Sequence, residues 1–365
     1  MTETTFAHQG ARLTINISAI IHNWRYFQSL HPNAETSAVV KADAYGLGII
    51  PVATALRAAG CRSYFVATLA EALELRSTID DREIFVLDGL RPGQEQDFIQ
   101  NGIAPCLNDL NQIGRWQKAA ERLSRPLPSI IHMDSGMNRL GLEAREREKL
   151  MEDWSLLEGL DLRIFMSHLA CADEIGHLLN DQQFRAFSAM RDCLPEVRFS
   201  LSASYGALMG PQWGFDLIRP GIGLYGGING AAFQHVISLE AQILQIRTIQ
   251  RGEHIGYGAT FTAERPSRIA TMDLGYADGY LRMSSNQGYI TIAGHRAPIV
   301  GRVSMDMIAA DITDIPESIV NTFDYVDVIG ADRKISTVAQ DSQTIPYEIL
   351  TSLGKRYQRR YVTKQ

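Results

Sequence analysis

Short apolar segments recur through the first two thirds of the chain, and helix-like segments separate most of them. The apolar segments are rich in β-branched and aromatic residues, which favour buried strands. Residues 51–59 stop at Gly60, and residues 69–76 and 143–154 are rich in strong helix formers, so these three segments predict helices. The eight strand-like segments centre on Val39-Val40, Phe65-Val66, Phe85-Val86-Leu87, Ile103, Ile130-Ile131, Ile164-Phe165, Val197 to Phe199 and Leu217-Ile218.

Eight strands that alternate with helices predict parallel βα units, and eight is the number that closes a TIM-type barrel. We therefore expect an α/β fold in which residues 12–234 form a (β/α)8 barrel. Ile103 and Leu217 mark the least strand-like of the eight segments.

The pattern changes after about Phe233, where long helical segments become scarce. Strand-like segments separated by Gly, Pro or Asp turns predict a second, mostly-β domain. We assign residues 235–365 to this domain, together with residues 1–11. Its expected strands are residues 236–247, 267–272, 288–292, 297–303 and 325–329.

Composition describes an ordinary globular protein, with 365 residues, 45% hydrophobic and 21% charged. A formal charge of −6, without a long basic run, argues against a nucleic-acid partner. We expect neither a secretory leader in residues 1–12 nor a membrane span. The four scattered cysteines show no zinc-type spacing, so we expect reduced thiols, no metal and a cytoplasmic location.

Lys41 is the first candidate for chemistry, because it ends the apolar run 38–40 and precedes a Gly-containing turn. An ammonium in such a place loses hydration, which lowers its pKa and frees the amine as a nucleophile. Such lysines commonly form a Schiff base with a carbonyl substrate or with pyridoxal phosphate. The alternative is a lysine at a strand end that extends to water.

Further candidates follow later strands at the end where barrel enzymes carry their active sites. His168 follows the sixth strand, Ser204 the seventh and Arg219 the eighth. The glycines after Arg219, beginning with Gly221, would let backbone N–H groups approach a phosphate, and Ser204 would add a hydroxyl. Pyridoxal phosphate needs both a lysine and a phosphate site, so the combination is more specific than either part.

Three more segments join this set. Arg139 lies just past the fifth strand, where its planar guanidinium could bind a carboxylate. Tyr257 and Tyr276 lie in Gly-rich turns of the β domain, and Met305-Asp306 places an apolar and an acidic group together. Each segment alone would more often be a structural turn.

Taken together, these segments resemble the bacterial alanine racemase family, and they run in the family's order from Lys41 to Tyr347. The resemblance implies a pyridoxal phosphate enzyme with an N-terminal barrel, a C-terminal β domain and a homodimeric active site. No single motif is decisive, but the ordered set is specific. The matching stretches are AVVKADAYGLG, DSGMNRLG, SHLA with His168, RPGIGLYG, YGAT, GYADGY, GRVSMD and Pro346-Tyr347-Glu348.

The resemblance implies two bases. Lys41 carries the cofactor as a Schiff base and then acts on the D-side of the substrate, while Tyr257 from the partner subunit acts on the L-side. Two groups on opposite faces can remove and return a proton without either moving around the ring. A tyrosine with a pKa of about 10 needs help to act as a base near neutral pH. The implied help is a hydrogen-bonded chain from Tyr257 through His168 to Arg219.

Other roles carry over by the same resemblance. Arg219 faces the pyridine nitrogen and disfavours its protonation, because two positive charges would adjoin. Arg139 and the partner's Met305 bind the substrate carboxylate, and Asp306 supports that site. Phosphate contacts are implied for Tyr45, Ser204, Gly221, Ile222 and Tyr347, and an access path for Arg282, Arg302 and Asp173.

Three positions depart from the commoner pattern of the family. His132 stands where many members carry a carbamylated lysine that braces the carboxylate-binding arginine, so what orients Arg139 is open. Asp43 and Leu47 replace a more usual Asn and His. Cys171, near His168, is expected to pack rather than react.

The expected activity is interconversion of L- and D-alanine, which supplies D-alanine for peptidoglycan. Racemisation of serine or of several amino acids is the alternative within the same chemistry. An amino-acid decarboxylase with a similar layout and a non-catalytic pyridoxal phosphate carrier are further alternatives. The tyrosine turn of the β domain, at Tyr257, argues against a carrier.

Overall fold

A computed structural model describes residues 10–194 and 196–363. The chain forms two compact units, which we call the barrel unit (residues 21–44 and 48–224) and the β unit (residues 10–20, 45–47 and 225–363). The predicted domain bounds, 12–234 and 235–365 with 1–11, stay a prediction. Residues 1–9, 195, 364 and 365 of that assignment lie outside the described part of the chain.

Seven parallel strands of the barrel unit form one sheet in the order β3-β4-β5-β6-β7-β8-β9. β3, β4 and β6 are buried throughout, which explains why they appear in the sequence as apolar runs rather than alternating patterns. The bounds are β2 Glu35–Thr36, β3 Ala38–Val39, β4 Ser63–Val66, β5 Glu83–Val86, β6 Ala104–Leu107, β7 Leu127–His132, β8 Leu160–Met166, β9 Arg198–Ser200 and β10 Leu217–Ile218.

The eighth predicted strand, β10, closes the ring. It pairs in parallel with β2, and the Ser37 N–H donates to Ile218 O at 3.0 Å. On its other side, the Arg219 N–H donates to Ser202 O at 2.9 Å, just after β9. All eight predicted segments, including the two weakest, are therefore strands of a (β/α)8 barrel, and the predicted fold class is confirmed.

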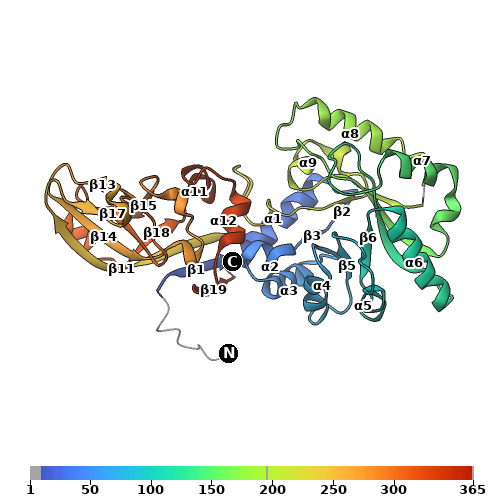
Figure 1. The fold of residues 1–365 in the computed structure, drawn as a ribbon, viewed down its shortest axis with the longest axis horizontal. Coiled ribbons are helices and arrows are strands. Elements are labelled where there is room, and N and C mark those ends of the chain that lie inside the picture. Colours follow the sequence, from blue (N-terminus) through green and yellow to red (C-terminus); the bar gives the residue numbers. More distant parts are fainter. Residues whose placement is uncertain (1–9, 195, 364–365) are drawn as a thin grey trace. The chain divides into compact units, whose positions relative to one another are not determined.

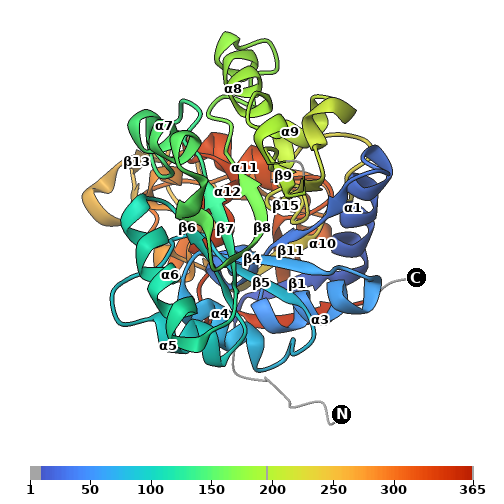
Figure 2. The ribbon, with the colours of Figure 1, turned by 90° about the vertical axis from the view of Figure 1, so that its right-hand side faces the viewer.

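Helices follow most of these strands, and Figure 2 shows α3 to α6 outside the ring of strands. Helix α3 ends at Gly60, whose φ of +108° supplies the left-handed stop that the sequence predicts. The helices along residues 17–208 are α1 Ile17–Leu30, α2 Lys41–Gly46, α3 Ile49–Ala59, α4 Leu69–Arg76, α5 Glu95–Gln100, α6 Leu110–Leu123, α7 Ala144–Glu152, α8 Leu178–Ser188 and α9 Ser204–Leu208.

The long strand β11 organises the β unit (Figure 1). It pairs with β1, β14 and β18, and β1 is in turn parallel to β19. The strand bounds are β1 Arg12–Asn16, β11 Ile237–Ile249, β12 His254–Ile255, β13 Phe261–Thr262, β14 Ser267–Asp273, β15 Tyr289–Ile292, β16 His295–Pro298, β17 Met307–Asp311, β18 Tyr325–Ile329 and β19 Gln358–Val362. The short helices are α10 Glu317–Val320, α11 Ile335–Asp341 and α12 Pro346–Ser352.

One predicted strand is wrong in its bounds. Residues 297–303 were expected to be one strand, but β16 stops at Pro298. Beyond Pro298, Ile299 forms an isolated antiparallel bridge with Ala310, and Gly301 then has a φ of +77°. In the described part of the chain, no helix is long and apolar enough to cross a membrane.

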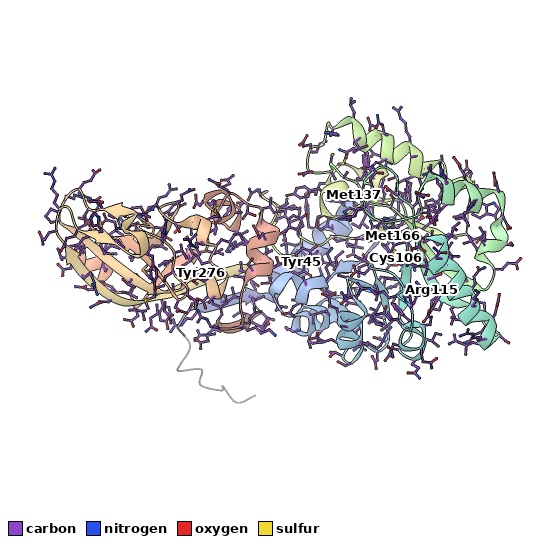
Figure 3. All side chains as sticks on the ribbon, viewed as in Figure 1. Tyr45, Cys106, Arg115, Met137, Met166 and Tyr276 are labelled. Atoms are coloured by element: carbon purple, nitrogen blue, oxygen red, sulfur yellow. The ribbon has the colours of Figure 1, made fainter. Side chains whose placement is uncertain are left out.

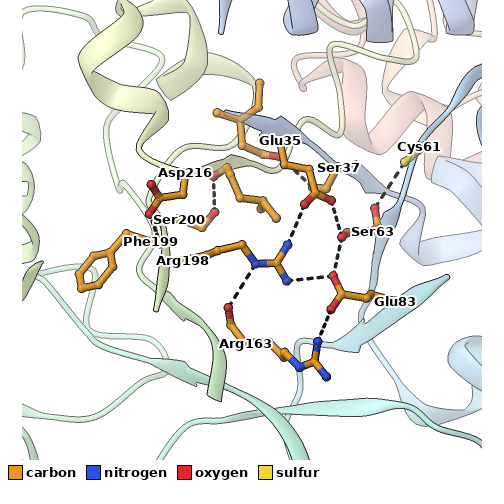
Figure 4. Close-up of polar contacts among 12 residues, drawn as sticks. Glu35, Ser37, Cys61, Ser63, Glu83, Arg163, Arg198, Phe199, Ser200 and Asp216 are labelled. Carbon is orange, nitrogen blue, oxygen red and sulfur yellow. Dashed lines mark hydrogen bonds and ion pairs between the residues drawn. The ribbon is translucent and has the colours of Figure 1, made fainter. Parts of the chain in front are cut away.

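An ionic network joins the N-terminal ends of several barrel strands (Figure 4). Arg198, the first residue of β9, binds Glu35 of β2 at 2.7 Å and Glu83 of β5 at 2.9 Å. The buried Ser63 hydroxyl donates to the same two carboxylates. Because this end lies opposite the strand ends that carry the candidate chemistry, we assign the network to stability.

We predict that Arg198→Met destabilises the barrel by about 2 kcal/mol, because two half-buried carboxylates lose their partner. All four tryptophans lie in the barrel unit, so urea unfolding followed by tryptophan fluorescence reports on it. The control is Arg91→Met, which removes an exposed 3.7 Å pair with Asp88 and should leave the midpoint unchanged. Equal midpoints for the two variants would contradict the assignment.

Candidate functional site

Lys41 begins the turn that follows strand β3, at the end of the barrel where the strands finish. The next four residues, 42–45, have φ angles between +52° and +56°, so helix α2 is a left-handed turn. Each L-residue in this conformation costs about 1–2 kcal/mol. Strain of this kind persists only where the surroundings hold it, and it is common at functional sites.

Two carboxylates hold this turn. Glu71 Oε1 accepts the Ala42 N–H at 2.7 Å, while Glu71 Oε2 accepts two N–H groups before helix α4. Asp43 Oδ1 accepts the Ile49 N–H at 2.7 Å. The carboxylate of Asp43 therefore anchors the start of helix α3.

The surroundings of Lys41 favour the neutral amine. Burial lowers the pKa of Lys41, and repulsion from Arg139 lowers it further, whereas Asp88 and Glu71 raise it. The net direction is downward. A larger fraction of this amine is unprotonated near neutral pH than for an exposed lysine, as nucleophilic use requires.

Basic side chains gather at this end of the barrel. His132 ends β7, His168 lies two residues after β8, and Arg219 follows β10 directly. Burial lowers the pKa of His168 well below its usual value, and Arg219, Arg139, His132 and Lys41 lower it further. These effects place the other four groups within electrostatic range of His168, as the strand-end rule predicts.

Arg219 is buried, with carbonyl groups as its partners. Its two Nη atoms donate to Ser200 O at 2.8 Å, to Ser167 O at 2.6 Å and to Leu201 O at 3.2 Å, and Nη1 also contacts the Ser200 hydroxyl. No carboxylate pairs with it in the described part of the chain. Burial lowers the pKa of Arg219 to about 10, so the guanidinium stays charged at neutral pH.

Asn108 determines which nitrogen of His132 carries the proton. The Asn108 Nδ2 donates to Leu87 O at 3.3 Å and to Cys106 O at 3.0 Å, which directs Oδ1 to His132 Nδ1 at 2.8 Å. His132 Nδ1 must therefore donate, and Nε2 carries a lone pair. Burial and repulsion from Arg219 lower the pKa of His132 to about 4, so the ring is neutral.

The loop that carries Arg139 is tightly tied. Its two ends meet in a bridge between Met133 and Leu142. The Asp134 Oδ1 accepts three successive N–H groups of residues 136–138, at 2.8, 2.9 and 3.2 Å. A fixed loop thus holds the exposed Arg139, whose planar guanidinium suits a carboxylate.

Ser204 and the glycine loop after β10 come together as the sequence predicts. Ser204 is buried at the start of α9, and its Oγ accepts the N–H groups of Gly221 at 2.9 Å and Gly223 at 3.1 Å. Because Oγ accepts both, the Ser204 O–H remains a donor for an anion. Ile222 lies between these two glycines.

Tyr45 and Tyr347 pack in one aromatic cluster of the β unit. The Tyr45 ring centroid lies 4.7 Å from that of Tyr225 and 6.1 Å from that of Tyr347. Burial raises the pKa of Tyr45, so its hydroxyl remains a donor. Tyr225 was not singled out from the sequence.

Tyr257 lies in a turn between two glycines of the β unit, with φ of +68° at Gly256 and +72° at Gly258. Its side chain is 74% exposed and that of Met305 is 53% exposed. A Cβ at Gly258 would lie 2.7 Å from Arg302 Nη1, so the guanidinium of Arg302 adjoins the tyrosine turn. Large apolar side chains at such positions favour an interface.

In the β unit, Arg356 connects the loop that carries Asp278 to the loop that carries Met305 and Asp306. Its guanidinium binds both oxygens of Asp278, at 2.7 and 2.8 Å, and Asp306 Oδ1 at 2.8 Å. The Ala277 N–H also donates to Met305 O at 3.0 Å. The partner of Asp306 is therefore Arg356, a residue that the sequence did not bring forward.

The predicted residues divide between the two units, so the structure brings together only those within each. The implied chain from Tyr257 through His168 to Arg219 remains a prediction, because Tyr257 belongs to the other unit. The barrel unit holds Lys41, His132, Arg139, His168, Asp173, Ser204, Arg219, Gly221 and Ile222, and the β unit holds Tyr45, Tyr257, Arg282, Arg302, Met305, Asp306 and Tyr347.

Cys106 lies inside the barrel unit, with its Sγ 3.6 Å from Met166 Sδ (Figure 3). Burial raises the pKa of the Cys106 thiol to about 12, so it packs as a neutral side chain. All four cysteines are free. Within residues 10–194 and 196–363, no cluster of His, Cys, Asp or Glu could hold a metal ion.

Two family models match almost the whole chain. The model for the alanine racemase N-terminal domain matches residues 15–229, and that for the alanine racemase C-terminal domain matches residues 236–361. An alanine racemase of Brucella abortus (strain 2308) is 42% identical over 97% of this chain and 94% of its own length. A catabolic alanine racemase of Agrobacterium fabrum is 43% identical over 97% and 92%.

The fold agrees with a solved structure of the same kind. Alanine racemase from Bartonella henselae, crystallised with covalently bound pyridoxal phosphate, superposes with a TM-score of 0.92 and 40% identity. The match covers 97% of this chain and 99% of that one.

We predict that His132 makes stability fall as the pH is lowered. Its pKa of about 4 in the folded chain lies below the ordinary 6.5, so the unfolded chain binds the proton first. The stabilisation is complete above pH 6.5 and is lost as the pH falls toward 4, by roughly 2 kcal/mol between pH 7.5 and 5.

The measurement is urea unfolding, followed by tryptophan fluorescence, at these two pH values and one salt concentration. His132→Asn keeps a donor toward Asn108 but cannot titrate, so its stability should fall about 2 kcal/mol less than that of the unsubstituted chain. An identical fall in both proteins would show that His132 does not titrate differently on folding.

Proposed function

The chain belongs to the alanine racemase family and is a pyridoxal phosphate-dependent racemase, and we propose that it interconverts L- and D-alanine with Lys41 and Tyr257 as opposite bases. The observation that carries this assignment is the basic cluster at the strand ends. Lys41, Arg139 and Arg219 lie within electrostatic range of the neutral His168 there, and Arg219 has only neutral partners among the described residues.

Such a cluster fits an anionic cofactor together with a carboxylate substrate. Unmatched positive charge in a partly buried site attracts anions and raises their local concentration. A phosphate and an amino-acid carboxylate would supply the missing negative charge. The donor set also fits, since it combines one reactive amine with the hydroxyl and backbone donors around Ser204.

The residues present could bind each part of the cofactor. Lys41 would hold the cofactor covalently through Nζ, and Ser204, with the backbone of Gly221 and Ile222, would hold the phosphate. Tyr45 and Tyr347 would add hydroxyl donors. When bound, pyridoxal phosphate draws electrons from the substrate Cα and makes its hydrogen acidic.

Arg219 would limit how strongly the cofactor draws those electrons. A charged guanidinium beside the pyridine nitrogen disfavours a proton on that nitrogen. Three carbonyl oxygens accept hydrogen bonds from its Nη atoms, which fixes the orientation of the guanidinium. The weaker electron withdrawal suits racemisation, in which the proton must return quickly, and disfavours side reactions.

The two bases need different help. The lowered pKa of Lys41 frees its amine to take or return a proton on the D-side. Tyr257 needs stabilisation of its deprotonated form, because the ordinary tyrosine pKa is about 10. We assign this help to His168, whose neutral ring lies within range of the Arg219 charge.

The functional enzyme would be a homodimer. Tyr257 is 74% exposed in the single chain and Met305 53%, so neither is buried in a site of its own subunit. We infer that these side chains enter the partner's active site, where Arg139 and Met305 would bind the substrate carboxylate and Asp306, with Arg356, would support the loop. Arg282, Arg302 and Asp173 would line the access path.

We place the enzyme in the cytoplasm, where D-alanine would feed peptidoglycan synthesis. Racemisation of serine or of several amino acids remains the alternative. Hydrogen exchange at Cα across a panel of amino acids separates these, and serine turnover well above alanine turnover would favour the alternative. Carbon dioxide release from any amino acid would instead indicate a decarboxylase.

We predict that the purified protein, loaded with pyridoxal phosphate, absorbs visible light and that borohydride removes the band while labelling Lys41. Peptide mapping locates the label, and Lys41→Arg should abolish both the band and the label. A colourless protein that leaves optically pure alanine unchanged would contradict the proposed function.

We predict that Tyr257→Phe keeps the visible band but lowers conversion of L-alanine by a factor of about 10²–10⁴, since the L-side base is lost. The matched control is Tyr325→Phe, which keeps the ring beneath Arg12 in the same unit and should convert alanine normally. Unchanged turnover in Tyr257→Phe would exclude the two-base scheme.

A further inference from the structure

The left-handed turn after Lys41 needs support from outside itself. Four consecutive residues with side chains, 42–45, lie in this conformation, which together cost on the order of 4–8 kcal/mol. Whole domains have a net stability of only about 5–15 kcal/mol. The turn would therefore relax unless specific contacts held it.

The turn satisfies only part of its own backbone. The Ala44 N–H donates to Val40 O at 2.9 Å, and the Gly48 N–H donates to Asp43 O at 2.8 Å. The Ala42 N–H lies in the first part of the turn, where N–H groups lack a carbonyl partner within a helical segment. Its acceptor is the side chain of Glu71.

Glu71 is itself immobilised. Its Oε2 accepts the N–H groups of Ala67 at 2.8 Å and Thr68 at 3.1 Å, and the Thr68 hydroxyl accepts the Glu71 N–H in return. With one oxygen fixed by two bonds, the other oxygen is aimed at Ala42. The carboxylate thus joins the end of β4 to the residue that follows Lys41.

We propose that Glu71 is a positioning residue for Lys41, because its carboxylate fixes the Ala42 N–H and so holds the left-handed turn that presents the lysine amine to the cofactor. This inference rests on the proposed role of Lys41. The expected ligand is the aldehyde of pyridoxal phosphate, and Glu71 need not touch it.

The simpler interpretation is that Glu71 only caps helix α4. Thr68 and Glu71 do form a capping box, and loss of a cap costs about 0.5–2 kcal/mol. Thr68→Ala breaks that box without removing the bond to Ala42, so it isolates the capping role. Glu74→Gln neutralises an exposed carboxylate on the same helix. The Glu74 side chain makes no hydrogen bond within the described part of the chain.

The test compares Glu71→Gln, Glu71→Ala, Thr68→Ala and Glu74→Gln as loaded enzymes. A glutamine keeps the volume but offers one oxygen, so it cannot accept on both sides. For both Glu71 variants we expect the Ala42 amide to exchange hydrogen at least about tenfold faster, and the cofactor to dissociate about tenfold more readily on dilution, followed by loss of the visible band. Thr68→Ala should lower the melting temperature but keep the protection of the Ala42 amide and the cofactor affinity. Glu74→Gln should leave all three quantities unchanged.

Two results would overturn the inference. One is an Ala42 amide as protected in Glu71→Gln as in the unsubstituted chain, and the other is an equal loss of cofactor affinity in Thr68→Ala. If Glu71→Ala fails to fold, Glu71→Gln carries the test alone. Failure of the proposed function would differ, since the unsubstituted chain would then lack a band that borohydride removes from Lys41.

Discussion

The rest of the site depends on the gathering of positive charge at one end of a barrel. Arg139 and Arg219 lower the pKa of both His132 and His168 in addition to burial, and Lys41 lowers that of His168. Burial and Arg139 lower the pKa of Lys41 in turn, while Arg219 remains charged. One arrangement therefore favours neutral bases and provides a binding site for anions, which are the two requirements of proton transfer on a carboxylate-bearing substrate.

Backbone geometry supplies what charge alone cannot. The Coulomb interaction falls off gradually with distance and has little dependence on orientation, whereas attack on a carbonyl carbon requires an aligned amine. The left-handed turn at residues 42–45 defines the direction of the chain on one side of Lys41, and strand β3 defines it on the other. Strain at this point is offset by hydrogen bonds from neighbouring barrel segments, so the site and the barrel depend on each other.

Sequence reasoning succeeded where a residue's role follows from its place at a strand end. The apolar runs of the barrel located Lys41, His168 and Arg219 at the same edge, and the structure agrees. Sequence reasoning failed where a residue's role depends on a backbone N–H donor or on the orientation of a side-chain amide. The spacing of Thr68 and Glu71 could have revealed a helix start, but no pattern shows that the second oxygen reaches Ala42.

The tautomer of His132 could not be predicted from the sequence for the same reason. It follows from two carbonyls that orient Asn108, and those carbonyls come together only in the folded barrel. In the β unit, strands β1 and β19 were missed; they come from distant parts of the chain and pair with each other only in the folded unit. The strand expected at residues 297–303 was wrong because the pairing of β16 with β15 ends at Pro298, after which Ile299 forms an isolated bridge with Ala310.

The pairing of β1 has a consequence for biosynthesis on the ribosome. β1 is made well before β11 and β19, yet it lies between them in the sheet. The barrel strands can find their neighbours as each appears, whereas β1 keeps an unpaired edge until β19 has been made. Unpaired edges invite association between nascent chains, so the interval between the synthesis of β11 and that of β19 is when this edge is most exposed to aggregation.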